Sequence, residues 1–382
     1  MLNCNPIGAG SGYTYLTNEV AATDDYYLKG TAQGEAPGVW MGSGLSLLGL
    51  ESGSEVTAQQ MESMFGLLQD WRTGEQLGRR PQVFRSFDER IAEALAQAPD
   101  ATLEQREQII GRVRRSDPKT LREVDRAVAK ATRTEGVLSP ERRAEIELKV
   151  RSKTQKEAVA GFDLTFSPPK SVSLLWAGLD GVQRDHVVAA QHAAVGAALV
   201  ALERDGVKTR QGGRGVRQTD VRGGVIAARF DHRTNREGEP QLHSHVAVLN
   251  RVKTTDGKWL TLDGRAISVW RGAAAEVYHN RLAVELEQRL GVATTRDERT
   301  GAFEVVGVDI AVREMFSTRT AQVNDRLAEL RHEYRAEHGS DPGRSADREL
   351  RDRAKKETRR AKEGHESELD AFGRWRHVAA AN

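Results

Sequence analysis

Two neighbouring segments with alternating polarity constrain the fold more than any other feature of the chain. "VRGGVIAARFDHRT" (residues 221–234) and "PQLHSHVAVLNRV" (residues 240–252) alternate apolar and polar side chains over much of their length. A period of two is that of a β-strand, and the loop "TNREGEP" between the two segments turns the chain back. The pair therefore predicts an antiparallel hairpin, and "KTTDGKWLTL" supplies an Asp-Gly turn into a further strand.

The chain divides into four parts by the character of its sequence. Residues 1–78 contain short pieces joined by glycine turns, and residues 79–156 are charged, amphipathic helices with breaks at Pro99, Pro118 and Pro140. Residues 157–308 carry the predicted sheet, and residues 309–382 are helical and heavily charged. The predicted fold class is α+β, in which an antiparallel sheet is covered by helices, with an inserted helical segment and a helical C-terminal region.

The composition excludes some classes of protein and leaves others open. No run of about 18 apolar residues appears, and the start "MLNCNPIGAGSG" lacks the pattern of a secretory signal, so we expect a soluble cytoplasmic protein without membrane insertion. Cys4 is the only cysteine, so a metal would be held by histidine, carboxylate or water. The net charge of +2 neither requires nor forbids a nucleic-acid partner.

Three of the ten histidines, His232, His243 and His245, fall within fourteen residues of the predicted hairpin. His243 and His245 are two apart and share a strand face, and the hairpin can bring His232 opposite them. Three neutral nitrogen donors suit a divalent metal and leave coordination positions open for catalysis. The alternative reading is a strand face with scattered histidines. His-x-His pairs also occur in cupins and metallohydrolases, which commonly add an acidic ligand soon after, and "VAVLNRVK" has none.

Four of the six tyrosines, Tyr13, Tyr15, Tyr26 and Tyr27, lie in the first 27 residues. A deprotonated phenol beside an open divalent cation can attack a phosphodiester, whereas the alternative role of such tyrosines is half-buried packing. Asp163 lies on the polar face of a predicted strand, just before "SPPKS". It can accept the phenolic proton or orient a metal-binding imidazole, and its alternative role is to cap the end of the strand.

Taken together, "GFDLTFSPPKSVS", "FDHRTNREGEPQLHSHVAVLN" and "DGKWLTL" resemble the relaxase domains of the MobF type, the TraI/TrwC-like conjugative relaxases. The resemblance covers the first fifty residues and about 161–308. It implies a circularly permuted HUH endonuclease whose palm sheet holds a divalent metal ion (Mg, Mn or Zn) on His232, His243 and His245. It further implies that Asp163 lies beside the nucleophile, and that one DNA strand is cut through a 5′-phosphotyrosine intermediate.

The resemblance leaves the order of the tyrosines open. In better-known members the first tyrosine pair is adjacent, whereas here Thr14 separates Tyr13 from Tyr15. We favour Tyr15 as the nucleophile, because eleven residues, close to three helical turns, separate it from Tyr26, and Tyr13 is the alternative. The helical segment before Asp163 is longer than in the simplest relatives, and the sequence does not define its role.

Candidate DNA contacts come from basic side chains near the predicted sheet. The glycine-rich stretch "GVKTRQGGRGVRQTDVRGG" can follow phosphates closely, or it can be a solvated basic loop. Trp40 can stack on a base or belong to the core. "RAKKETRRAKEG" reads as a charged helix surface, and the resemblance implies as an alternative that helices after the palm close over bound DNA. The candidate contacts are Lys170, Lys208, Arg210, Arg214, Arg217 and Arg222.

Three classes of function fit these patterns: a conjugative relaxase, a replication-initiator or transposase-type HUH nuclease, and a histidine-metal enzyme acting on small molecules. The tyrosines and the basic stretch disfavour the third class, and the match at "DLTFSPPKS" favours the first. The expected partners are single-stranded or cruciform transfer-origin DNA, relaxosome accessory proteins and a secretion-system coupling protein. The chain lacks a GxxxxGK[ST] loop, and we expect it to be the N-terminal part of a longer protein fused to a helicase.

Overall fold

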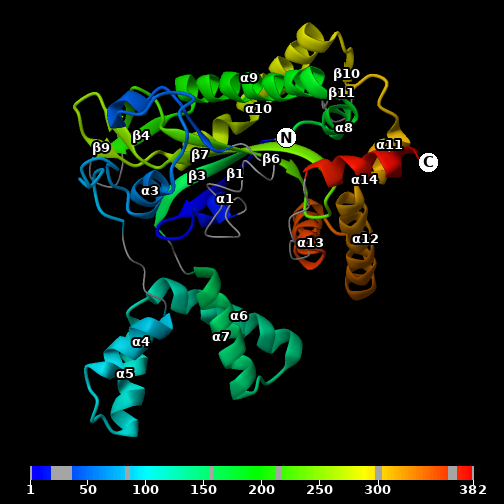
Figure 1. Cartoon of the computed structure of the whole chain (residues 1–382). Coiled ribbons are helices and arrows are strands. Elements are labelled where there is room, and N and C mark those ends of the chain that lie inside the picture. Colours follow the sequence, from blue (N-terminus) through cyan, green and yellow to red (C-terminus); the bar gives the residue numbers. More distant parts are fainter. Residues whose placement is uncertain are drawn as a thin grey trace. The chain divides into compact units, whose positions relative to one another are not determined.

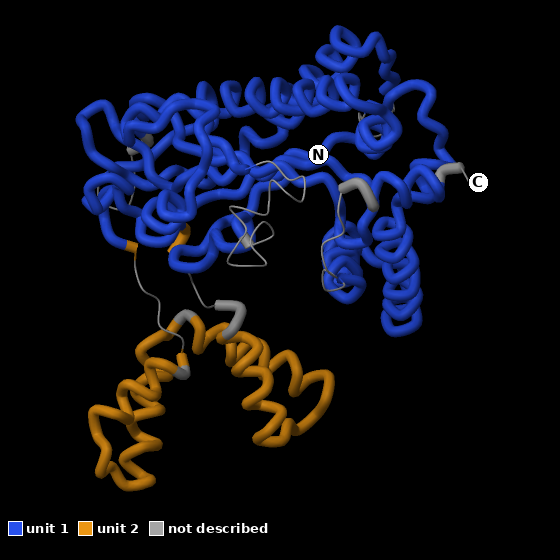
Figure 2. The backbone as a smooth tube through the Cα atoms, in the orientation of Figure 1, with its two compact units in different colours: residues 1–80, 160–382 blue, residues 81–159 orange. Residues whose placement is uncertain are grey.

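The computed structural model describes residues 2–18, 37–81, 87–154, 158–211, 217–296, 303–359 and 368–380. Figure 2 shows two compact units, one formed by residues 1–80 together with 160–382 and the other by residues 81–159. The second unit is helical, where the sequence predicted an insertion at residues 79–156. The predicted site residues that the structure describes all belong to the first unit.

The first unit is built on a five-stranded sheet in the order β1 (Leu2–Gly8), β3 (Val159–Phe166), β7 (Pro240–Leu249), β6 (Ala227–Thr234) and β2 (Val39–Met41). The pairs β3–β7, β6–β7 and β2–β6 are antiparallel. The hairpin predicted from the alternating segments is β6–β7, at the middle of the sheet, and its register pairs His232 with His243. The predicted α+β fold with an antiparallel sheet is confirmed.

One face of this sheet is covered by α8 (Lys170–Gly178), α9 (Gly181–Asp205) and α10 (Gly264–Leu290) (Figure 1). Leu164, Phe166 and Val246 project from the strands into a core shared with these helices. By length and composition alone, α9 is apolar enough to cross a membrane. Its buried side packs in this core and against α10, which accounts for its apolar character.

The opposite face carries a second core, formed with the short N-terminal elements. These elements are α1 (Thr14–Asn18), η1 (Leu45–Leu48), α3 (Ala58–Met61) and η2 (Glu62–Gly66). Trp40 is fully buried there and its Nε1 donates to Gln60 Oε1 at 2.9 Å. Trp40 is therefore a core residue, and the alternative that it stacks on a base is wrong.

The remaining strands of the first unit form two small sheets. One has the order β4 (Lys208–Gln211), β5 (Arg217–Arg222), β8 (Val252–Thr254) and β9 (Trp259–Leu260), and the other is the hairpin β10 (Thr294–Arg296) and β11 (Phe303–Val305). Four helices follow: α11 (Ile310–Met315), α12 (Thr318–His338), α13 (Arg344–Glu357) and α14 (Glu368–Ala380). The helical C-terminal region thus begins close to the predicted boundary at residue 309.

The second unit consists of α4 (Phe87–Ala96), α5 (Leu103–Arg115), α6 (Pro118–Glu135) and α7 (Pro140–Thr154). The side chains of Thr102 and Gln105 cap the start of α5 reciprocally, and Asp117 caps α6. Pro118 and Pro140 each occupy the first helical position, where the missing N–H costs no hydrogen bond. Two of the three prolines that the sequence analysis read as breaks, Pro118 and Pro140, are therefore the first residues of α6 and α7, and Pro99 lies in the turn between α4 and α5.

Candidate active site

The three histidines meet on one face of the central hairpin. His232 of β6 pairs directly with His243 of β7, and His245 follows two residues later on the same face. The ring centroids lie 5.3 Å apart for His232 and His243, 5.2 Å for His232 and His245, and 5.2 Å for His243 and His245. The strand alternation thus gathers three imidazoles into a nearly equilateral triangle.

Hydrogen bonds fix the tautomers of two of these rings. His245 Nδ1 lies 2.9 Å from Asp163 Oδ2, and His243 Nδ1 lies 3.0 Å from the carbonyl oxygen of Gln241. A carboxylate and a carbonyl oxygen only accept, so both Nδ1 atoms carry the proton and each Nε2 keeps its lone pair. This is the arrangement in which protein imidazoles bind metal ions.

The donor set fits a divalent metal ion. Nitrogens about 2.1 Å from a tetrahedral ion would place the centroids of their rings about 5 Å apart, which is the spacing observed here. The ring planes of His232 and His243 are only 29° from parallel, and both planes are steeply inclined to the plane of the His245 ring. In the ring orientations of the structure, no group of three or more His, Cys, Asp or Glu side chains among the described residues is arranged so that it could hold a metal ion. Binding of an ion by these three imidazoles would therefore require the rings to reorient.

Tyr15 lies at the edge of this cluster. It belongs to α1, and its hydroxyl donates to Asp163 Oδ2 at 2.8 Å. Its ring stands edge-on to His245, with centroids 6.3 Å apart, and 38% of the residue is exposed. Asp163 is 3% exposed and accepts from both Tyr15 and His245. One carboxylate therefore links a reachable phenol to the histidine cluster.

Tyr13 has a different environment. It packs against the second core, and a Cβ placed on Gly66 of η2 would lie 3.3 Å from its ring. Burial, together with the negative charge of Glu62, raises the pKa of Tyr13 above its ordinary value. The surroundings of Tyr13 therefore make it harder to ionise than a free phenol. Tyr26 and Tyr27 lie outside the described residues.

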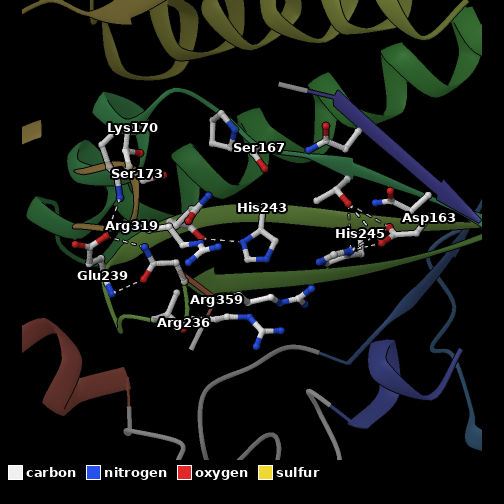
Figure 3. A pocket seen from close by; sticks show the side chains of 18 of the residues that line it. Asp163, Ser167, Lys170, Ser173, Arg236, Glu239, His243, His245, Arg319 and Arg359 are labelled. Carbon is white, nitrogen blue, oxygen red and sulfur yellow. Dashed lines mark hydrogen bonds and ion pairs between the residues drawn. The ribbon is translucent and has the colours of Figure 1, made fainter. Parts of the chain in front are cut away.

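A cleft of about 940 Å³ opens over the histidine face (Figure 3). Tyr15, Asp163, His243 and His245 line it, and so do Asn3 and Asn5 of β1. Lys170, a predicted DNA contact, also lines the cleft. Its Nζ donates to the carbonyl oxygen of Pro240 at 3.0 Å, and burial lowers its pKa against the opposing effect of Glu239.

The cleft also contains basic residues that the sequence analysis did not single out. Arg236 comes from the turn between β6 and β7, Arg319 from α12, and Arg359 from the segment after α13. Arg236 lies inside the quoted loop "TNREGEP", so proximity to the histidines was a usable signal. Arg359 lies inside the quoted run "RAKKETRRAKEG", but Arg319 and Arg359 are both far from the hairpin in sequence, and tertiary structure brings them to it.

Those of the other predicted DNA contacts that the structure describes do not line this cleft. Lys208 and Arg210 lie on β4 and Arg222 on β5, and Arg210 Nε forms an ion pair with Asp263 Oδ2 at 2.6 Å. Arg217 begins β5, and Arg214 falls outside the described residues. The described ones belong to the small sheet β4–β5–β8–β9, and none of them is among the residues that line the cleft.

Comparisons with known proteins agree with this architecture. Residues 9–382 match the family of the TrwC relaxase. Two curated relatives, both the multifunctional conjugation protein TraI of Escherichia coli, are 36% and (strain K12) 34% identical over 178 residues. The match covers 44% of this chain and 10% of each relative, so the chain corresponds to a small part of their length.

Solved structures of the conjugative relaxase TrwC share the fold. A copper-bound complex with oriT DNA is 24% identical with a TM-score of 0.62, and a metal-bound complex with oriT DNA is 23% identical with the same TM-score. Each alignment covers 100% of this chain and 98% of the TrwC chain. The match to the family extends over nearly all of the sequence, and the chain belongs to the TrwC relaxase family.

Proposed function

We propose that this chain nicks one strand of DNA at a plasmid transfer origin and becomes linked to the 5′ phosphate through Tyr15. The observation that carries the proposal is the 2.8 Å hydrogen bond from the Tyr15 hydroxyl to Asp163, whose carboxylate also contacts His245 of the histidine cluster. Nucleophile, proton acceptor and candidate metal ligands are thereby connected by direct contacts. Structures of TrwC bound to oriT DNA support the choice of substrate.

The chemistry follows from the contacts of Asp163. Its carboxylate takes the phenolic proton as the Tyr15 oxygen forms a bond to the scissile phosphorus, and the bond from phosphorus to the 3′ oxygen breaks. The 3′ oxygen leaves with the bonding electrons and gains a proton from water. Because one phosphodiester replaces another, the reaction can run backwards when the 3′ hydroxyl attacks the phosphotyrosine.

His232, His243 and His245 would hold a divalent cation, for which the candidates are Mg, Mn and Zn. When bound, the cation polarises a non-bridging oxygen of the phosphate. The hydrogen bond from His245 Nδ1 to Asp163 keeps Nε2 of that ring available for it. Metal-bound structures of TrwC support this assignment.

Two further proposals concern residues and partners beyond the described site. Tyr26 or Tyr27 would serve a second strand transfer, and Lys208, Arg210, Arg214, Arg217 and Arg222 would contact DNA phosphates outside the cleft. We also propose that this protein is cytoplasmic, that it works with relaxosome accessory proteins and a coupling protein, and that it is fused to a helicase in the full-length protein. The multifunctional TraI relatives support a longer parent protein.

A gel assay tests the proposed function. The protein is incubated with labelled single-stranded oligonucleotides from a candidate transfer origin and Mg²⁺ or Mn²⁺, and denaturing electrophoresis detects a covalent adduct. We expect an adduct with the natural protein and with Tyr13→Phe, and none with Tyr15→Phe. An adduct of equal yield with Tyr15→Phe would remove Tyr15 from the mechanism. Hydrolysed DNA without any adduct would instead indicate a metal-bound water as nucleophile.

A further inference from the structure

The helical unit of residues 81–159 carries a row of cations that the proposed active site does not use. Along α6 the intervals between these cations are four, four and three residues. With 3.6 residues per turn, such intervals place the side chains on one face of the helix. We call them the α6 stripe, and its members, all exposed, are Arg122, Arg126, Lys130 and Arg133.

The other side of α6 is apolar. Leu121, Val124 and Val128 lie there, Val124 is buried, and the other two are half-buried. Figure 1 shows α7 beside α6, and the two helices pack against each other. An amphipathic helix turns its apolar side towards its neighbours, so the α6 stripe faces the solvent.

The charges of the α6 stripe are not neutralised within the unit. Arg142 of α7, by contrast, pairs with Glu135 at 2.9 Å and with Glu145 at 2.7 Å. Within the described part of the chain no member of the stripe forms an ion pair, and Arg122 Nε donates to the carbonyl oxygen of Pro118 at 3.1 Å. The stripe can therefore attract an anionic partner.

Two carboxylates lie at the edges of this face of α6. By the helical period, Glu123 follows one edge of the stripe and Asp125 the other. Glu123 is half-buried, and Asp125 is exposed. They are outnumbered by the cations of the stripe, so the face stays positive. Asp125 also offers a substitution that would make the face more positive without touching the stripe.

The length of the stripe suits a row of phosphates. Arg122 and Arg133 are eleven residues apart, which corresponds to about 16 Å along a helix. One strand of a DNA duplex carries a phosphate about every 3.4 Å of its axis, so the stripe runs past about five of them. Contacts of this kind carry no sequence information.

The composition of the unit favours a duplex over a single strand. Proteins that bind single strands combine cations with aromatic side chains on which the bases stack. Residues 87–154 contain one aromatic residue, Phe87, and Arg151 lies over its ring, 3.6 Å from the centroid. We propose that the α6 stripe binds the phosphate backbone of duplex DNA without regard to sequence. This second DNA surface goes beyond the proposed nicking of a single strand by the first unit.

The chain leaves and re-enters the first unit at two points that are held next to each other. Arg251, which is buried, donates to the carbonyl oxygens of Leu77 at 2.6 Å and Arg79 at 2.8 Å. The backbone N–H of the neighbouring Asn250 donates to the carbonyl oxygen of Ala160 at 2.8 Å. Because both junctions are anchored in the first unit, exposed substitutions on α6 should leave the active site intact.

Fluorescence anisotropy of the full chain tests the proposal. The ligands are two labelled duplexes of unrelated sequence and their separate single strands. The variant combines Arg126→Ala with Lys130→Ala, and alanine keeps the helix because it is the best helix former. The matched control combines Arg348→Ala with Arg351→Ala, which removes the same charge from exposed positions of α13. Circular dichroism verifies that the helical content is unchanged.

The stripe variant should bind both duplexes roughly ten-fold more weakly, and the slope of log affinity against log salt should become shallower by about 1.8, which is about 0.9 for each lost phosphate contact. Binding of the single strands should change by less than about two-fold, because stacking and other cations dominate there. Asp125→Asn should tighten binding of the duplexes about two-fold, since it removes a negative charge beside the stripe.

Three results would overturn the proposal: unchanged duplex binding in the stripe variant, an equal loss for single strands, or an equal loss in the α13 control. Formation of the covalent adduct on a single-stranded oligonucleotide should be the same in the stripe variant and in the natural protein. Absence of an adduct with the natural protein would refute the proposed nicking function and would leave the duplex measurement as a separate result.

Discussion

The two faces of the β6–β7 hairpin use similar residue types for opposite purposes. One face carries His232, His243 and His245; His243 and His245 line the open cleft together with Tyr15, and His232 is buried beside them. The other face presents Asp231 and Ser244, which pair with each other across the strands and point into the helical layer. Adjacent positions on the same two strands thus form two different environments. One is a histidine cluster beside an open cleft, and the other is a closed network of hydrogen-bonded polar side chains.

The side chains of the closed network are engaged in hydrogen bonds with one another. Ser244 Oγ donates to Asp231 Oδ1 at 2.6 Å and accepts from Gln191 Nε2 at 3.2 Å, while Tyr278 donates to Gln191 Oε1 at 2.7 Å. Burial opposes ionisation of Asp231, yet bonds from His192 and Ser244 and the charge of Arg229 hold its pKa well below its ordinary value. Full burial raises the pKa of Tyr278 far above that of a free phenol.

The comparison teaches that reactivity here depends on which partners a side chain has, and not on its type. Tyr278 and Tyr15 both donate to a side-chain oxygen, but Tyr278 is fully buried and donates to an amide, whereas Tyr15 is reachable and donates to a carboxylate. His192 bonds a structural carboxylate, and His245 bonds the carboxylate that also contacts Tyr15. Each pair offers a matched test.

The tyrosine pair should give the largest difference. Tyr15→Phe keeps the ring but removes the nucleophile, so formation of the covalent adduct should fall by roughly 10³-fold or more. Tyr278→Phe should leave the adduct within a few-fold of wild type, because its hydroxyl lies in the closed network. Quantitative gel analysis of adduct formation checks both. Equal loss in the two variants would mean that the faces are not functionally separate.

Two histidines on opposite faces of the sheet, His243 and His192, test which face binds the metal ion. His243→Gln should lower the affinity for Mn²⁺, measured by isothermal titration calorimetry, by more than the roughly 10–100-fold that loss of an outer contact costs. His192→Gln, on the opposite face, should bind Mn²⁺ nearly as the natural protein does. Chelation of the metal should mimic His243→Gln in the cleavage assay. Unchanged Mn²⁺ affinity in His243→Gln would remove the metal site.

Asp163→Asn should give the next largest effect. The amide cannot accept the phenolic proton, so cleavage should slow by roughly 10²-fold, and its pH optimum should rise because hydroxide must then ionise Tyr15. The pH profile of single-turnover cleavage measures both changes. A slower reaction with an unshifted profile would show that Asp163 positions His245 or Tyr15 without accepting the proton.

The smallest effect concerns stability. Tyr278→Phe leaves Gln191 Oε1 buried without its donor, which should lower the free energy of unfolding by about 1–3 kcal/mol. Denaturant unfolding with the natural protein as reference gives this value. A loss of Mn²⁺ affinity in the folded Tyr278→Phe variant would show that the closed network also affects the histidine face.

The central part of the site was predictable because it depends on local periodicity. Alternation along residues 221–252 predicted the hairpin and the shared face of the three histidines, and the strand before "SPPKS" directed attention to Asp163. A period of two fixes the face of a side chain whatever the tertiary context. The antiparallel sheet covered by helices followed from the same signals.

Contacts between distant segments were not predictable. Spacing favoured Tyr15 through a helical relation to Tyr26, but the structure distinguishes it from Tyr13 by a hydrogen bond to Asp163, 148 positions away. Arg319 and Arg359 reach the cleft only because Glu239 and the end of α13 fix α12 and α13 there. Lys170 was predicted to bind DNA, and its hydrogen bond to Pro240 of the hairpin joins segments that are 70 positions apart in the sequence.

Mass spectrometry of a trapped protein–DNA adduct tests the central claim most directly. The adduct is formed with a labelled oligonucleotide, digested with protease and nuclease, and the peptide that carries the nucleotide is sequenced. The geometry of the Tyr15–Asp163–His245 contacts predicts a nucleotide phosphate on Tyr15. A modified peptide with the nucleotide on Tyr13, or on any residue outside 13–27, would contradict the account.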